Sequence, residues 1–146
     1  MPRDYKKVVA WQRSHELTLA VYKHTRSFPN DERFGITSQV RRASYSVPAN
    51  ISEGSGRDSN KDYLRFLFIS LASLASLKET EYFLLLARDL EYLPEKEYDR
   101  LTETVNGTFA ALQGLIKVVK KEVGGFGRLH ALLTSFALIT LGKLTT

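Results

Sequence analysis

The sequence predicts an all-α protein: an up-and-down four-helix bundle with a long third helix that associates with copies of itself. Two observations predict this fold. Apolar residues recur three and four positions apart in four successive stretches, which is the spacing of one helix face, and proline or glycine separates these stretches. The chain of 146 residues is long enough for one domain with a core. We therefore expect a four-helix bundle domain at residues 1–123. Residues 124–146 form a glycine-led apolar tail whose conformation the sequence does not determine.

The first predicted helix runs from about Val8 to Ser27 and carries part of the basic excess of the chain. One of its faces is an apolar stripe that belongs to the core. Trp11 lies on an aromatic flank of this stripe, where packing against a neighbouring helix or subunit is favoured over a base-stacking role. The core stripe contains Ala10, Leu17, Val21, His24 and Phe28.

The second predicted helix lies within residues 35–59 and has two different faces. Its apolar residues are spaced so that they share one side of a helix. Pro48 has no backbone N–H, so the carbonyl of Ser44 loses its partner within the helix. Gly54 and Gly56 are expected to end the helix through a left-handed glycine. The apolar face contains Ile36, Val40, Ala43, Val47 and Ile51.

A polar stripe beside this apolar face is the best candidate site, and three interpretations of it compete. The first is a hydrogen-bond network between helices or subunits that fixes the register of the bundle. The second is binding of phosphate groups by clustered arginines, with side-chain amides donating further bonds. Catalysis is the least favoured. The predicted nucleic-acid-binding residues are Gln39, Arg41, Arg42, Asn50 and Arg57, and the stripe itself comprises Gln39, Arg42, Ser46, Asn50 and Glu53.

The third predicted helix starts after Ser59 and meets no breaker until Pro94. That length corresponds to about 50 Å at about 1.5 Å per residue. Between Tyr63 and Leu77 it is apolar on nearly every side, whereas a helix of a four-helix bundle needs only one apolar face. Contact with another copy of the chain is the simplest way to bury the additional apolar surface. The predicted interface residues are Trp11, Tyr63, Phe66 and Phe68.

The fourth predicted helix begins at Pro94, has acidic residues at its start and has lysines near its end. The helix dipole explains this charge pattern without a ligand. The glycine-rich run 124–127 is expected to break the helix. The tail beyond it is too short to span a bilayer, and a fifth helix, a loose segment and disorder all remain open for it. The core face contains Tyr98, Leu101, Val105, Phe109, Leu112, Ile116, Val119 and Val123.

Motifs for chemistry are scarce in this chain. There is no cysteine, and the three histidines form no Glu-x-x-His pair of the kind that builds metal sites in bundles. No nucleophile elbow or P-loop occurs, so we expect neither an enzyme nor a metal or other cofactor. The N-terminal sequence lacks a signal-peptide core and no long uncharged apolar run is present, so a cytoplasmic protein without membrane spans is expected. The net charge of +5 permits attraction to phosphate backbones.

Residues of the second helix carry a resemblance to a known family. They are Gly35, Gln39, Arg41-Arg42-Ala43, Ser46-Val47-Pro48, Asn50-Ile51 and Glu53-Gly54, with Trp11-Gln12, Glu16-Leu17, Tyr22, Phe28-Pro29 and Glu32 upstream. Over residues 4–122 the chain resembles the four-helix-bundle proteins encoded in intervening sequences of bacterial 23S rRNA genes. The resemblance implies a small non-enzymatic bundle that assembles as a homopentamer. The family is related to the accessory variability proteins of diversity-generating retroelements. This relation implies that the protein binds nucleic acid as an accessory of a reverse transcriptase.

Two functions remain open at this stage. The first is an oligomeric accessory that binds the phosphate backbone of RNA or DNA without sequence specificity, with a reverse transcriptase as one expected protein partner. The alternative is a protein–protein scaffold that binds no nucleic acid, which the excess apolar surface of the third helix favours.

Overall fold

The computed structural model describes residues 4–56 and 60–142, with side chains at 4–56 and 65–125. These residues form helices, and no strand occurs among them. Three short 3-10 helices, Tyr5–Lys7, Thr25–Ser27 and Asn30–Glu32, precede and follow the first α-helix. The α-helices are α1 (Val9–His24), α2 (Ile36–Ser55), α3 (Asn60–Asp89) and α4 (Glu95–Gly142).

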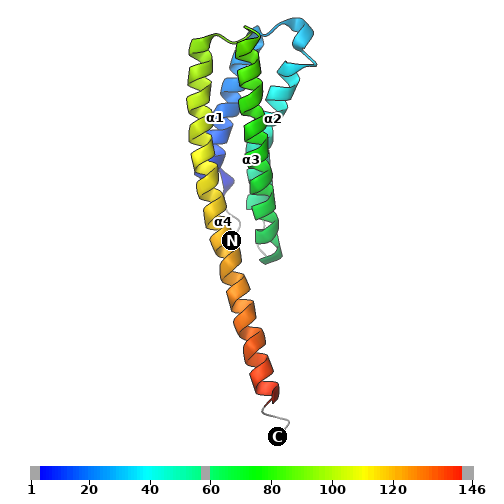
Figure 1. Cartoon of the computed structure of the whole chain (residues 1–146), viewed down its shortest axis with the longest axis vertical. Helices are drawn as coiled ribbons and strands as arrows, with labels where there is room; N and C mark the ends of the chain where they lie inside the picture. Colours follow the sequence, from blue (N-terminus) through cyan, green and yellow to red (C-terminus); the bar gives the residue numbers. More distant parts are fainter. Residues whose placement is uncertain (1–3, 57–59, 143–146) are drawn as a thin grey trace.

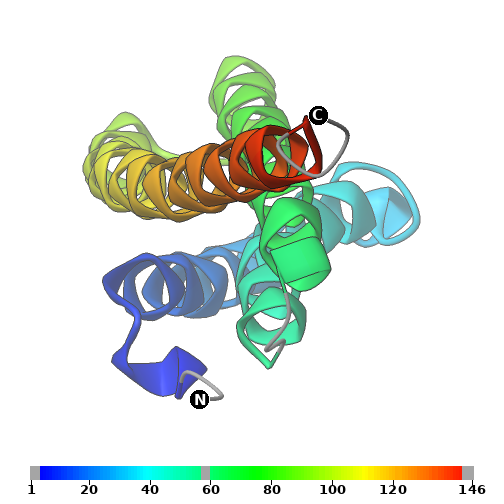
Figure 2. The ribbon, with the colours of Figure 1, turned by 90° about the horizontal axis from the view of Figure 1, so that it is seen from below.

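The four α-helices form one bundle in which each helix runs opposite to the one before it (Figure 1). Helix α1 packs against α2 and α4, and α3 packs against the same two helices from the other side. The view along the bundle in Figure 2 shows this arrangement end on. The predicted up-and-down four-helix bundle is therefore confirmed. In the described part of the chain, no helix is long and apolar enough to cross a membrane.

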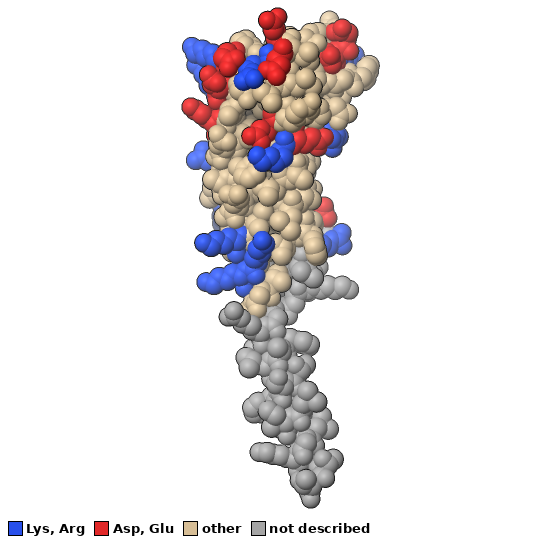
Figure 3. Space-filling model, in the orientation of Figure 1, with Lys and Arg blue, Asp and Glu red and all other residues tan. Residues whose placement is uncertain are grey.

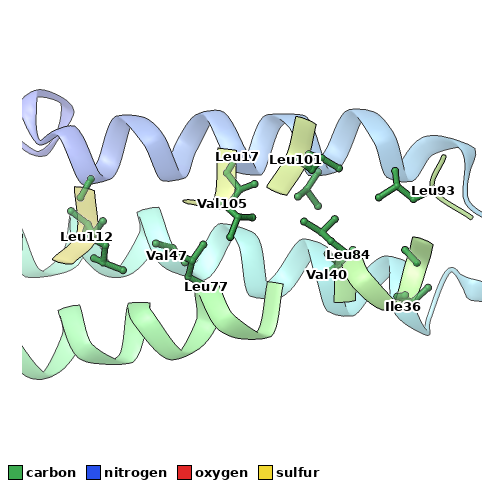
Figure 4. Close-up of a cluster of buried hydrophobic side chains, with 14 of the residues drawn as sticks. Leu17, Ile36, Val40, Val47, Leu77, Leu84, Leu93, Leu101, Val105 and Leu112 are labelled. Atoms are coloured by element: carbon green, nitrogen blue, oxygen red, sulfur yellow. The ribbon is translucent and has the colours of Figure 1, made fainter. Parts of the chain in front are cut away.

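The core consists of aliphatic side chains from all four helices that point toward a common interior (Figure 4). Every residue of the predicted apolar face of α2 is buried. The stripe predicted for α1 is buried too, except that His24 is half-buried, with its Nε2 3.5 Å from Oε2 of Glu97. The buried residues at the centre include Leu17, Val40, Val47, Leu77, Leu84, Leu101, Val105 and Leu112.

The carbonyl of Ser44, which Pro48 deprives of a donor, finds a partner on another helix. The hydroxyl of Thr18 on α1 lies 3.0 Å from this carbonyl oxygen. Both residues are buried, and the same hydroxyl lies 2.9 Å from the carbonyl of Ser14. Helix α2 therefore continues past its proline to Ser55, because a side chain of α1 replaces the missing backbone donor.

The end of α2 differs from the prediction. No glycine in the described residues has a positive φ, and Gly56 follows the helix at φ −83° and ψ 12°. The prediction that a left-handed glycine ends α2 is therefore wrong. Gly54 serves close packing instead, because a Cβ at this position would overlap with the ring of Phe66. Phe66 is only 3% exposed, so this ring packs within the chain and has almost no surface left for a second copy.

The predicted break after residue 123 is also wrong. Helix α4 continues through the glycine run to Gly142 and extends past the end of the other helices in Figure 1. Glycine in a helix costs about 1 kcal/mol relative to alanine, but it keeps its N–H and its hydrogen bond. Proline would have removed that bond. The other end of this helix follows Pro94, whose carbonyl accepts from the amides of Glu97 and Tyr98.

Helix α3 ends earlier than predicted, at Asp89 rather than just before Pro94. The connection that follows contains Glu91 in the left-handed region, at φ 62°. The connection contains no glycine, and its one proline, Pro94, stands at its far end, so the sequence places the turn later than the structure does.

Candidate nucleic-acid interface

The predicted polar stripe of α2 does not form one site. Arg42 lies on the seam between α2 and α3, where its Nη2 donates to Oε1 of Glu79 at 2.5 Å. Nε and Nη2 of Arg42 also lie 3.4 Å from Oε1 of Gln39. About half of the Arg42 side chain is exposed, so the pair joins two helices at the surface and contributes at most about 1 kcal/mol. This part of the stripe fits the structural interpretation, an ion pair between helices.

The remaining predicted residues of the stripe lie elsewhere. Asn50 is half-buried and is eleven residues from Gln39, which corresponds to about 16 Å along a helix. Glu53 forms an ion pair with Arg65 of α3 at 3.8 Å. Arg57 lies outside the described residues.

Arg41, the neighbour of Arg42, points toward α1 because successive residues of a helix are about 100° apart. Its Nε donates to the hydroxyl oxygen of Thr25 at 2.8 Å. Its guanidinium carbon lies 4.7 Å from the centre of the Tyr22 ring, a cation–π arrangement. Two contacts from α1 and the turn after it therefore hold this guanidinium group in place while leaving other N–H donors for a ligand.

A hollow of about 160 Å³ lies where α1 ends and α2 begins. This end of the bundle is at the top of Figure 1. We name the hollow the arginine pocket, because three arginine residues line it. None of these arginines forms an ion pair with a carboxylate of the described residues. The lining residues are Thr25, Arg26, Phe28, Pro29, Asn30, Arg33, Thr37 and Arg41.

Thr37 in the first turn of α2 adds an unsatisfied polar group to this pocket. The residue is 8% exposed, and its hydroxyl oxygen has no hydrogen-bond partner within the described residues. A buried polar group without a partner costs roughly 1–3 kcal/mol. The backbone N–H groups of a first helical turn also lack partners in the helix and carry partial positive charge.

Glu32, an acidic residue of the turn between α1 and α2, makes its contacts with the start of α2 and with Tyr92. Oε2 of Glu32 accepts a hydrogen bond from the backbone N–H of Ile36 at 3.1 Å and so caps α2. Its Oε1 accepts from the hydroxyl of Tyr92 at 3.3 Å. Burial, and then the negative charges of Glu32 and Asp31, raise the pKa of Tyr92. Both carboxylate oxygens of Glu32 therefore already accept hydrogen bonds, one from the start of α2 and one from Tyr92.

An exposed aromatic ring lies beside the arginine pocket. Phe34 is 85% exposed, and the guanidinium carbon of Arg33 lies 5.4 Å from the centre of its ring. Sequence reasoning missed Arg26, Arg33, Phe34 and Thr37. The dipeptide Arg33-Phe34 in the link between two helices was the available signal, since a basic residue beside an aromatic residue is typical of surfaces that bind single strands.

Comparison with known proteins identifies the family. The family model described as 23S rRNA-intervening sequence protein matches residues 6–114. The chain belongs to this family. A solved structure from Bacteroides thetaiotaomicron VPI-5482, a protein with unknown function from the S23 ribosomal protein family, has a TM-score of 0.65 and 25% sequence identity to it. That similarity covers 75% of this chain and 96% of the other. No curated protein matches the chain.

The chain has a second basic region near the opposite end of the bundle (Figure 3). Lys117 and Lys120 of α4 line a hollow of about 380 Å³ whose other lining residues include Leu71, Leu74 and Ile116. This hollow lies between α3 and α4 and is lined by both apolar residues and lysines. In the described part of the chain, no group of three acidic or histidine side chains could hold a metal ion.

The residues predicted to join copies of this family member differ in their surroundings. Phe68 is 64% exposed on α3. Trp11 is half-buried, donates from Nε1 to the hydroxyl oxygen of Ser52 at 2.9 Å and stacks on His15 with ring centres 4.8 Å apart. The side chain of Tyr63 lies outside the described side chains. Phe68 is thus the predicted interface residue that leaves a large apolar surface exposed.

Proposed function

We propose that this protein is a non-enzymatic accessory that binds the phosphate backbone of nucleic acid without sequence preference. The arginine pocket carries the proposal. Arg26, Arg33 and Arg41 line one hollow, and none of them forms an ion pair with a carboxylate of the described residues. Guanidinium groups bind phosphate oxygens through pairs of charge-assisted hydrogen bonds.

The neighbouring aromatic ring favours single strands over duplexes. Phe34 is 85% exposed and lies next to Arg33, so a base could stack on its ring while the adjoining phosphate meets the arginines. Stacking on an aromatic side chain contributes about 1–3 kcal/mol per base and tolerates every base. Contacts to phosphate and to base faces carry little sequence information, which fits binding without sequence preference.

Fluorescence anisotropy with labelled single-stranded RNA, single-stranded DNA and duplex DNA tests this proposal. For three phosphate contacts, log K should fall with log salt with a slope of about −2 on single strands. Scrambled sequences should bind with equal affinity. Absence of salt-sensitive binding to all three nucleic acids would refute the proposal.

We also propose that the protein works as an assembly of copies in the cytoplasm, as a homopentamer if it follows the family resemblance, with a reverse transcriptase as its protein partner. The exposed apolar residues Phe68 and Leu71 on α3 support association, since contacts between copies would cover them. Light scattering tests the mass of the assembly. A monomer at micromolar concentration would refute association.

A protein scaffold without nucleic-acid binding is the second candidate. Phe68 and the hollow lined by Leu71, Leu74 and Ile116 favour it, because together they form an apolar surface on α3 and α4. An assembled protein that binds none of the three nucleic acids would favour this function over the first.

A further inference from the structure

We propose that the arginine pocket is a site for a phosphate monoester at the end of a nucleic-acid strand. The protein then binds phosphorylated strand ends more tightly than ends that carry a hydroxyl group. This inference rests on the proposed function, because it names the part of a nucleic acid that enters the pocket.

The pocket has room for a phosphate group. Its volume is about 160 Å³, several times the roughly 30 Å³ that a water molecule occupies in the liquid. A terminal phosphate has one strand leading away from it, whereas an internal phosphodiester must find space for two.

The charge of the pocket fits a monoester better than a diester. A phosphate monoester carries about −1.5 to −2 charges near pH 7 and presents three strong acceptor oxygens. A diester carries a single charge and has two free oxygens. Three arginines line the pocket, Arg26, Arg33 and Arg41, and their side chains together carry more positive charge and more donors than a diester can use.

Part of the site is already ordered without a ligand. Two contacts hold the guanidinium group of Arg41. Its Nε lies 2.8 Å from the hydroxyl oxygen of Thr25, and its Cζ lies 4.7 Å from the centre of the Tyr22 ring. A group that is fixed before binding loses little side-chain freedom when the ligand arrives.

Thr37 is the second and independent observation. The residue lines the pocket, and its hydroxyl oxygen is nearly inaccessible to solvent and has no hydrogen-bond partner in the described part of the chain. Such a group destabilises the empty protein, and a rotation about the Cα–Cβ bond toward the pocket would let it donate to a phosphate oxygen.

Anisotropy titrations compare one single-stranded oligonucleotide in three forms, with a 5′-phosphate, with a 3′-phosphate and with hydroxyl groups at both ends. We expect a phosphorylated form to bind about tenfold more tightly, as one additional charge-assisted hydrogen bond predicts. Arg41→Gln and Thr37→Val should each reduce this preference to within about twofold. Arg42→Gln removes the same charge from the adjacent residue and should leave the preference unchanged, because Arg42 pairs with Glu79.

Inorganic phosphate is the second probe, and it tests whether the pocket binds phosphate when no nucleic-acid strand is attached. Adding it should shift backbone amide NMR signals of residues 25–41 and raise the melting temperature. Thr37→Val should melt a few degrees higher than the wild type without phosphate, because it removes an unsatisfied hydroxyl, and should gain less from added phosphate. Circular dichroism of each variant checks that it is folded.

The outcomes separate the two proposals. Equal, salt-sensitive binding of all three oligonucleotide forms would overturn the terminal-phosphate site and leave backbone binding intact. Phosphate-induced shifts confined to the lysines of α4 would also overturn it. Failure to bind any oligonucleotide at any salt concentration would instead overturn the proposed function.

Discussion

Thr18→Val should destabilise the bundle more than the loss of one ordinary threonine hydroxyl, because Pro48 leaves the carbonyl of Ser44 without its usual helical donor. Pro48 removes the backbone N–H that would serve this carbonyl, and the Thr18 hydroxyl lies 3.0 Å from it in a buried position. Valine matches the shape of threonine but cannot donate. The carbonyl would remain buried and unpaired, which costs about 1–3 kcal/mol of unfolding free energy.

A double-mutant cycle isolates this contribution. In a Pro48→Ala background, the amide of residue 48 can donate to the Ser44 carbonyl. Thr18→Val should then cost less than about 1 kcal/mol, so the coupling between the two positions should be about 1–2 kcal/mol. The absolute stability of Pro48→Ala does not enter the coupling.

Thr80→Val is the matched control. Thr80 is also fully buried, and its hydroxyl donates to the carbonyl of Ser76 in its own helix at 2.9 Å. No proline follows within the next turn, so that carbonyl keeps its helical amide. Loss of the Thr80 hydroxyl should therefore lower the unfolding free energy by less than about 1 kcal/mol.

The assay is chemical denaturation followed by circular dichroism, with the unfolding free energy obtained by linear extrapolation. All variants are compared at one protein concentration, since association changes apparent stability. If Thr18→Val costs no more than Thr80→Val, or costs the same with and without Pro48, then Thr18 does not replace the missing donor.

Three further predictions concern stability. Gly54→Ala should lower the unfolding free energy by about 1–2 kcal/mol, because its methyl group would overlap with Phe66, whereas Gly114→Ala, which has open space around it, should raise it by up to about 1 kcal/mol in the same denaturation assay. The raised pKa of Tyr92 means that the folded state favours the neutral phenol; melting temperatures should therefore fall as the pH rises from about 10 through the higher folded-state pKa, and Tyr92→Phe should flatten this fall. Arg42→Gln should cost less than about 1 kcal/mol in chemical denaturation, because its ion pair is half-exposed, and a larger cost would show that this pair matters more than surface ion pairs usually do.

The helices and their buried faces could be predicted from the sequence because the relevant pattern is local. The apolar residues of α2 recur at helical spacing, and all of them are buried. The family resemblance rests on the same segment, and the family match over residues 6–114 confirms it. The glycine run at 124–127 misled the prediction, since low helix propensity alone does not end a helix that keeps its backbone hydrogen bonds.

Contacts between helices were harder to predict. The sequence shows that the Ser44 carbonyl loses a donor but not that Thr18, which is 26 residues earlier, supplies one. It shows glycine at position 54 but not the ring of Phe66 against it. The arginine pocket depends on the path of the turn between α1 and α2, which brings Arg26 and Arg41 to one hollow and sends Arg42 to another helix.

The most direct test of the central proposal is the salt dependence of single-strand binding for Arg41→Gln and Arg42→Gln, measured side by side by anisotropy. The two variants remove the same charge from adjacent residues of one helix. Binding through the arginine pocket predicts that Arg41→Gln reduces the slope from about −2 to about −1.4 and weakens every sequence alike, while Arg42→Gln leaves both slope and affinity unchanged. Equal effects of the two variants, or no effect of either, would contradict it.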